Sequence, residues 1–193
     1  MKQLFSLLLL CCMNLVSAQR VESPTGTLAL TFQLTPDGQP TYAVSYKNKP
    51  VVLSSALGVS LKDKTALVNH FEVTGTTTHA VNETWKPVLG EQAQIVNHYN
   101  ELIVALVQRD SKVKLNLVFS AFDEGVAFRY DFPKQENLNY FIISDEKTEF
   151  NLTENNKVFW IPGDFDSNEY VYKETKFSEI DNEKLNLNNG IGV

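Results

Sequence analysis

Apolar and polar side chains alternate with a period of two along much of the chain beyond residue 18. Residues 27–34 show the alternation most cleanly, and this period places successive side chains on opposite faces of a β-strand. No long stretch has the i, i+3, i+4, i+7 spacing of an amphipathic helix. The pattern predicts an all-β fold, with strands at residues 27–34, 41–46, 51–53, 57–61, 71–78, 95–107, 113–122, 126–132 and 140–143.

Short turn sequences separate these predicted strands. Pro36-Asp37-Gly38 favours a tight turn, because proline fixes φ and glycine accepts a positive φ. Residues 123–125, Asp-Glu-Gly, predict a second tight turn. Residues 95–122 are apolar at many consecutive positions, which is typical of strands covered on both faces. We therefore expect a layered sandwich of antiparallel strands.

The first eighteen residues have the parts of a secretory signal peptide. Lys2 supplies a positive charge, a short apolar run follows, and the segment ends in Val-Ser-Ala at residues 16–18. We expect cleavage near Ala18 and a periplasmic or secreted mature protein, with an uncleaved anchor as the alternative. Cys11 and Cys12 both lie in this segment, so the mature chain would contain no cysteine and no disulfide.

Composition and charge exclude several classes of function. Of the 193 residues, 43% are hydrophobic and 21% are charged, which is typical of a globular protein rather than a disordered or membrane protein. The formal net charge is −6, and no run of basic residues occurs. Nucleic-acid binding needs clustered lysine and arginine, so we expect no nucleic-acid partner.

His98 is the first candidate for chemistry, because Glu91 and Glu101 lie near it in sequence and histidine with carboxylates can bind a metal. A strand would point His98 and Glu101 to opposite faces, and no second histidine lies nearby. We favour a structural interpretation, in which His98 and the flanking asparagines bond to buried backbone groups.

Arg129 is the second candidate, since it stands alone among aromatic residues in 122–130. An arginine there can clamp a ligand carboxylate or phosphate. Pairing with an acidic residue, or stacking on a ring, is the interpretation we favour.

An acidic loop after an aromatic strand is the third candidate. Asp164, Asp166 and Glu169 follow Trp160, and Tyr170 comes directly after them. Carboxylates suit calcium, and flat rings suit sugars. The spacing does not match an EF-hand, and this loop cannot supply the six to eight oxygens that calcium takes. From composition alone, we favour a solvated acidic loop over a functional site.

Several blocks of sequence, in order, resemble the N-terminal domain of glycoside hydrolase family 97, the exported α-glucosidases and α-galactosidases of starch-utilisation type. The resemblance runs from the signal peptide to about residue 179. It rests on residues 21–24 (VESP), 83–91 (ETWKPVLGE), 97–102 (NHYNEL), 125–130 (GVAFRY), 138–141 (LNYF) and 159–164 (FWIPGD).

The resemblance implies a β-super-sandwich of the galactose mutarotase type at residues 19–179, preceded by a signal peptide at 1–18 and followed by a truncated or divergent tail at 180–193. It also implies partners that this sequence does not contain, namely a catalytic (β/α)8 barrel and a small C-terminal β domain. An α-linked oligosaccharide would be the substrate. Because the barrel carries the catalytic acids in this family, we expect the present chain alone to be an inactive fragment.

The resemblance further implies a metal ligand. In the calcium-dependent branch of the family, one carboxylate of the N-terminal domain joins barrel carboxylates around the ion, and Glu169 is the matching position. The sequence leaves open whether glucosides or galactosides are preferred.

Two other functions remain open. One is a free-standing carbohydrate-binding module with an aromatic platform such as Trp160 and Tyr170. The other is an aldose epimerase on the mutarotase-like fold, which would need acid and base residues drawn from His70, His79 and His98.

Overall fold

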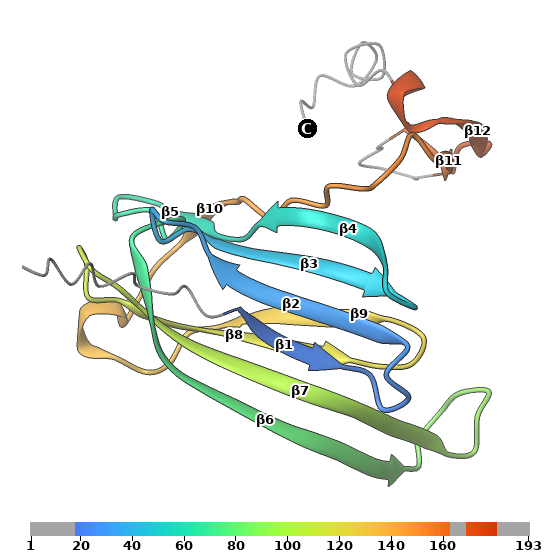
Figure 1. Ribbon diagram of the computed structural model, residues 1–193, viewed down its shortest axis with the longest axis horizontal. Coiled ribbons are helices and arrows are strands. Elements are labelled where there is room, and N and C mark those ends of the chain that lie inside the picture. The colour runs from blue at the N-terminus through green and yellow to red at the C-terminus, as the bar shows by residue number, and fades with distance from the viewer. Residues whose placement is uncertain (1–17, 163–168, 181–193) are drawn as a thin grey trace, which may run out of the picture. The chain divides into compact units, whose positions relative to one another are not determined.

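The structure is a computed structural model that describes residues 18–162 and 169–180. The chain divides into two compact units, one ending at Asn151 and one beginning at Leu152, and the predicted domain 19–179 spans both. The predicted signal peptide lies almost entirely outside the described residues. The described residues form strands and two short 3-10 helices, so the all-β prediction is confirmed (Figure 1).

The first unit contains two four-stranded antiparallel sheets. In each sheet, neighbours in space are neighbours in sequence, as in a simple meander. One sheet has the order β1 (Gln19–Glu22), β2 (Leu28–Leu34), β3 (Pro40–Tyr46), β4 (Lys49–Ala56). The other has the order β6 (Phe71–Trp85), β7 (Ile95–Gln108), β8 (Lys114–Ala121), β9 (Val126–Asp131).

Smaller elements complete the first unit. Strand β5 (Val59–Leu61) pairs with β10 (Ile143–Glu146), and the 3-10 helix η1 spans Glu136–Leu138. The second unit contains a hairpin of β11 (Lys157–Trp160) and β12 (Lys173–Lys176), followed by the 3-10 helix η2 (Phe177–Glu179).

The core lies between the two four-stranded sheets. Phe32 on β2 and Phe119 on β8 are fully buried, and their ring centroids are 5.8 Å apart. On β7 the even-numbered residues Leu102, Val104 and Leu106 face this core. The odd-numbered residues of β7 therefore face outward, because successive strand side chains alternate.

The turn at residues 36–38 forms as predicted. Gly38 has φ of +78°, and a Cβ at this position would lie 2.7 Å from the backbone nitrogen and oxygen of Phe71. Glycine is required there both for the backbone conformation and for the close approach of β6.

Polar contacts tie distant turns together around the sandwich. His70 adopts a positive φ at the start of β6, where its ring contacts the carboxylates of Asp110 and Asp37. Asp123 accepts hydrogen bonds from the backbone nitrogen and hydroxyl of Thr25, at 2.9 and 2.5 Å. The contact between Thr25 and Asp123 joins the turn after β1 to the turn after β8, and so links the two sheets.

Several strand predictions differ from the structure: β12 was not predicted, and β6 continues to Trp85, beyond its expected end at residue 78. Strand β1 is missed, because its polar residues at 19–22 follow the signal directly. The strand predicted at 140–143 begins only at Ile143, since Phe141 packs on Phe132 with centroids 4.7 Å apart and η1 precedes it. The predicted burial on both faces is confirmed for β8. In β7, residues 95–100 are not buried, and burial alternates from Leu102 onward.

Phe32→Ala tests the dependence of the fold on the interlayer contact. We expect it to lower the free energy of unfolding by about 3–5 kcal/mol, because a fully buried aromatic ring leaves a cavity. Tyr140, which is 77% exposed, provides the control, and its change to Ala should alter stability by less than about 0.5 kcal/mol. Denaturant unfolding at 25 °C measures both; equal effects would contradict this placement of the core.

Asp123 gives the stability a predictable dependence on pH. The hydrogen bonds from Thr25 hold the pKa of its carboxyl below the ordinary value of 3.8. A depressed pKa stabilises the folded state above pH 3.8, and this stabilisation is lost as the pH falls through the folded-state value. Asp123→Asn should therefore reduce stability at pH 7, and its difference from wild type should shrink below about pH 4.

Urea unfolding at pH 7, 5 and 3.5 measures the Asp123 effect, with Glu124→Gln as the neighbouring control. A difference between wild type and the Asp123 variant that stays constant over this range would contradict the assignment.

Candidate functional site

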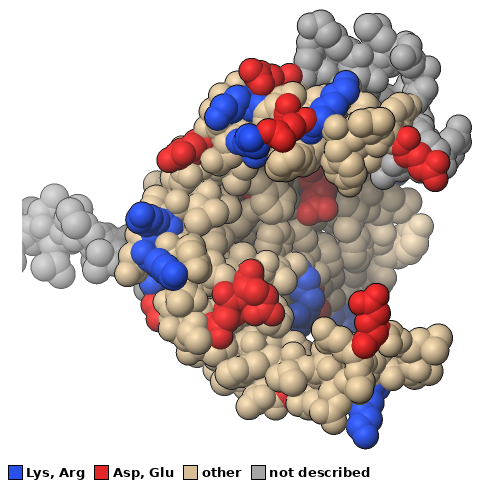
Figure 2. Space-filling view, turned by 90° about the vertical axis from the view of Figure 1, so that its right-hand side faces the viewer, with Lys and Arg blue, Asp and Glu red and all other residues tan. Residues whose placement is uncertain are grey.

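Charged side chains of both signs occur together on one face of the molecule. On the face drawn in Figure 2, lysine and arginine alternate with aspartate and glutamate among uncharged residues. None of the described segments forms a helix long and apolar enough to cross a membrane. Nothing on this face resembles the basic stripe that a nucleic-acid backbone requires.

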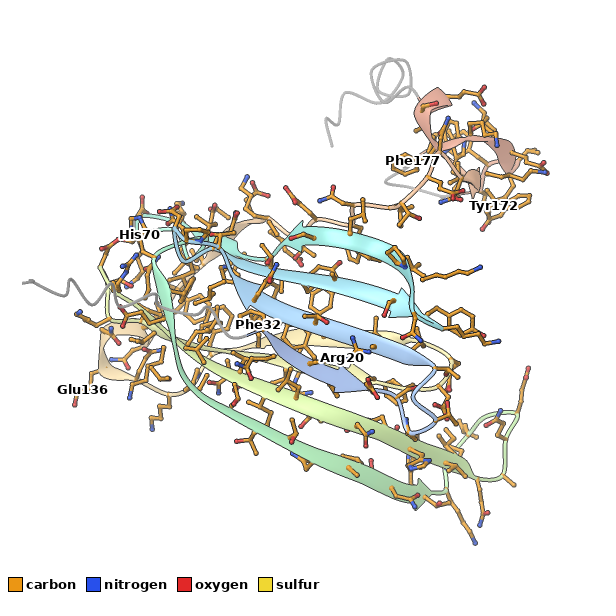
Figure 3. The ribbon with its side chains drawn as sticks, in the orientation of Figure 1. Arg20, Phe32, His70, Glu136, Tyr172 and Phe177 are labelled. Carbon is orange, nitrogen blue, oxygen red and sulfur yellow. The ribbon has the colours of Figure 1, made fainter. Side chains whose placement is uncertain are left out.

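Glu169 lies in the connection of the β11–β12 hairpin, near the start of β12. Its side chain is exposed, and Tyr170 beside it is 45% exposed. Tyr172 and Phe177 also project from this unit, with exposed fractions of 70% and 52% (Figure 3). Asp164 and Asp166, the other carboxylates proposed from the sequence, lie outside the described residues. The hairpin thus presents a carboxylate among exposed aromatic rings.

Trp160 occupies the last position of β11 and is held by β12. Its indole nitrogen donates a hydrogen bond of 2.9 Å to the hydroxyl of Thr175. The ammonium of Lys173 lies 5.0 Å from the ring centroid, a cation–π geometry. One face of the indole is therefore covered by the chain itself, which makes Trp160 a poor stacking platform for a sugar on that face.

The residues fit calcium only as part of a shared site. Among the described residues, no group of three or more histidine, cysteine, aspartate or glutamate side chains is arranged to hold a metal ion. A single carboxylate supplies at most two of the six to eight oxygens that calcium takes. Glu169, exposed on a loop, has the chemistry and accessibility of one hard ligand among several from elsewhere.

His98 and Glu101 lie on opposite faces of β7, as the sequence predicted. His98 pairs across the ladder with Asn82, and Glu101 pairs with His79. The structural role expected for His98 is wrong, because its side chain is exposed. Of the flanking asparagines included in that prediction, Asn100 does bond to the backbone, donating 2.8 Å to the carbonyl oxygen of Glu22, but Glu22 is exposed rather than buried.

Glu101 forms the most buried charged site of the described residues, with 5% of its surface exposed. The Nε2 atom of His79 lies 2.9 Å from one carboxylate oxygen, and the Nη1 atom of Arg129 lies 3.5 Å from the other. The predicted pairing of Arg129 with an acidic residue is confirmed. The sequence analysis named His79 only as a candidate for epimerase chemistry and missed its contact with Glu101, which depends on the β6–β7 register. Locating the hairpin turn between Trp85 and Ile95 would have predicted this contact.

An open hollow of about 320 Å³ lies where β1 meets β6 and β7. Arg20 and Glu22 on β1 form an ion pair of 2.9 Å at its wall, and Thr78 and Asn100 face it from the other sheet. Since Arg20 is neutralised by Glu22 two residues away, the hollow carries no uncompensated charge from this pair.

Comparison with known proteins gives consistent matches. The family model described as glycosyl-hydrolase 97 N-terminal matches residues 21–190, which extends past the domain end expected at Glu179. A retaining α-galactosidase of Bacteroides thetaiotaomicron is 27% identical over 134 residues, which is 67% of this chain and 19% of that protein.

Solved structures agree with these sequence matches. A glycoside hydrolase family 97 enzyme from Pseudoalteromonas sp. strain K8, in complex with panose, is 33% identical with a TM-score of 0.77, over 83% of this chain and 25% of that one. A β-arabinopyranosidase is 25% identical with a TM-score of 0.67, over 73% of this chain and 22% of that one. The chain therefore spans about a quarter or less of the length of the relatives that it matches.

Proposed function

The chain belongs to glycoside hydrolase family 97, in which it matches the N-terminal domain, and from this premise we propose that it serves as that domain of an exported α-glycosidase. The relatives include a retaining α-galactosidase and an enzyme bound to panose, so α-galactosides and α-glucosides are the proposed substrates. The family match over residues 21–190 is the observation that carries the proposal. The predicted signal peptide supports a periplasmic or secreted location.

The proposed partner is a catalytic (β/α)8 barrel, followed by a C-terminal β domain. The second unit supports such a partner, because none of its described residues between 152 and 180 is buried. A two-stranded hairpin without a core is marginal by itself in water. Its exposed side chains include Phe159 at 66% and Val171 at 88%, and covering them would stabilise both the hairpin and the complex.

Glu169 is the proposed calcium ligand of this domain. Its exposure allows the carboxylate to reach an ion shared with another domain, and the adjacent tyrosines allow the loop to pack against that domain. A bound calcium ion would supply Lewis acidity and orient sugar hydroxyls. The role of this chain is to hold one carboxylate in place at the edge of the substrate pocket of the proposed barrel.

The isolated chain should not hydrolyse glycosides. Glycoside hydrolysis needs two carboxyl groups at a defined separation, and we assign both to the proposed barrel. Incubation of the purified chain with panose or with a nitrophenyl α-galactoside should release no sugar above a buffer blank. Hydrolysis that copurifies with the tagged chain, and that disappears when the tag is used to remove the chain from solution, would contradict the assignment of both carboxyl groups to the barrel.

Replacing the carboxylate that matches Glu169 by an amide in a full-length family 97 enzyme should lower calcium affinity by about tenfold or more, since a ligating charge is lost. Activity should fall in parallel and partly recover at high calcium, with an unchanged circular dichroism spectrum. The matched control is the position of Glu174, which faces Lys157 on the hairpin and should tolerate the same change. Unaltered calcium affinity in the first variant would refute the ligand assignment.

A further inference from the structure

The long β6–β7 hairpin has an outward face that the core does not use. Leu102, Val104 and Leu106 of β7 point into the core, so alternation along the strand places its odd-numbered residues on the opposite face together with their β6 partners. We call this surface the hairpin outer face. It comprises Trp85, Ile95, Glu83, Asn97, Val81, Tyr99, His79 and Glu101, with Phe122 beside Tyr99.

Aromatic and apolar residues form two rows across this face. Trp85 lies opposite Ile95 in the ladder, and its side chain is 49% exposed. Val81 lies opposite Tyr99, whose ring packs on Phe122 with centroids 4.6 Å apart. The second row is thus supported from one side, which fixes the orientation of the tyrosine ring.

Rows of polar residues alternate with the two aromatic rows along the hairpin. Between the two aromatic rows, Asn97 donates a 2.8 Å hydrogen bond to the carboxylate of Glu83. Beyond the tyrosine row, His79 contacts the buried carboxylate of Glu101 at 2.9 Å. A carboxylate has about four acceptor positions, so Glu83 retains capacity for ligand hydroxyls while Asn97 holds it in place.

We propose that the hairpin outer face binds an α-linked oligosaccharide. Rings placed on either side of a fixed carboxylate–amide pair match a ligand with apolar ring faces and hydroxyl edges. The two aromatic rows are four residues apart along β6, which is about 13 Å at the rise of a strand. An oligosaccharide can contact both rows, whereas a single sugar cannot.

The pattern favours a sugar over other ligands. An anionic ligand would need an unengaged positive charge, yet His79 and Arg129 both contact Glu101, and Glu83 adds a negative charge to this face. A protein partner usually buries a continuous apolar centre, and here each apolar row is interrupted by a polar one. The choice of α-linked ligand rests on the proposed function, but the site is on a different unit from Glu169.

Tryptophan fluorescence offers a direct test on the chain itself. The protein has two tryptophans, so Trp160→Phe leaves Trp85 as the single reporter. Titration of this variant with panose or maltoheptaose should give a saturable change in emission. Glucose should bind at least about tenfold more weakly, because it contacts only one row.

Isothermal titration calorimetry on single variants of the chain identifies the residues that bind the oligosaccharide. Trp85→Ala and Asn97→Ala should each weaken maltoheptaose binding by about tenfold. Tyr46→Ala is the matched control, since Tyr46 is a 44% exposed aromatic residue on the other sheet, and it should leave the affinity unchanged. Thermal unfolding of each variant checks that the fold is retained.

Three outcomes would overturn the proposal: no saturable signal with either ligand, equal affinity in wild type and Trp85→Ala, or tighter binding of the β-linked cellopentaose. Glu169→Gln should leave oligosaccharide binding by this chain unaffected. Failure of the calcium assignment would therefore appear only in the full-length enzyme, and failure of the sugar site only in these titrations.

Discussion

Apolar contact between the inner faces of two four-stranded sheets is the interaction on which the first unit depends. Phe32, labelled in Figure 3, meets Phe119 across the layers, and the aliphatic residues of β2, β7 and β8 surround them. Burial of these side chains supplies the main driving force for folding. It also fixes register, because a shift of one residue would turn Leu102 and its neighbours out into water and bring Glu101 into the core.

The polar face of the second sheet follows from that constraint. Once Leu102, Val104 and Leu106 are committed to the core, alternation along β7 places Asn97, Tyr99 and Glu101 on the other face. The antiparallel partner strand then brings Glu83 and His79 opposite them. Glu101 is 5% exposed, and its burial on this face is tolerable because Arg129 compensates its charge and a ring nitrogen of His79 lies 2.9 Å from its carboxylate.

Local signals accounted for much of the fold but for little of the site. Alternation located β2 and β3, and the Pro36–Gly38 turn was predicted from its chemistry. Strand β10 was misplaced because Phe141 is held by packing on Phe132, a tertiary contact that the period of the sequence does not reveal. The His79–Glu101 pair was missed for a related reason: cross-strand neighbours depend on where the hairpin turns, and residues 86–94 lack the two-residue Asn-Gly signal that would mark it.

The two units place their exposed aromatic residues in different physical settings. In the β6–β7 hairpin, Tyr99 rests on Phe122 and the strands continue into a buried sheet, so an exposed ring is held rigidly without help from a ligand. In the β11–β12 hairpin no described residue is buried, and the rings around Glu169 have no core behind them. A preorganised surface can bind a small ligand without paying an ordering cost. An unsupported hairpin gains most from a large partner that supplies the missing core, and this difference is why we assign a sugar to the first surface and a protein domain to the second.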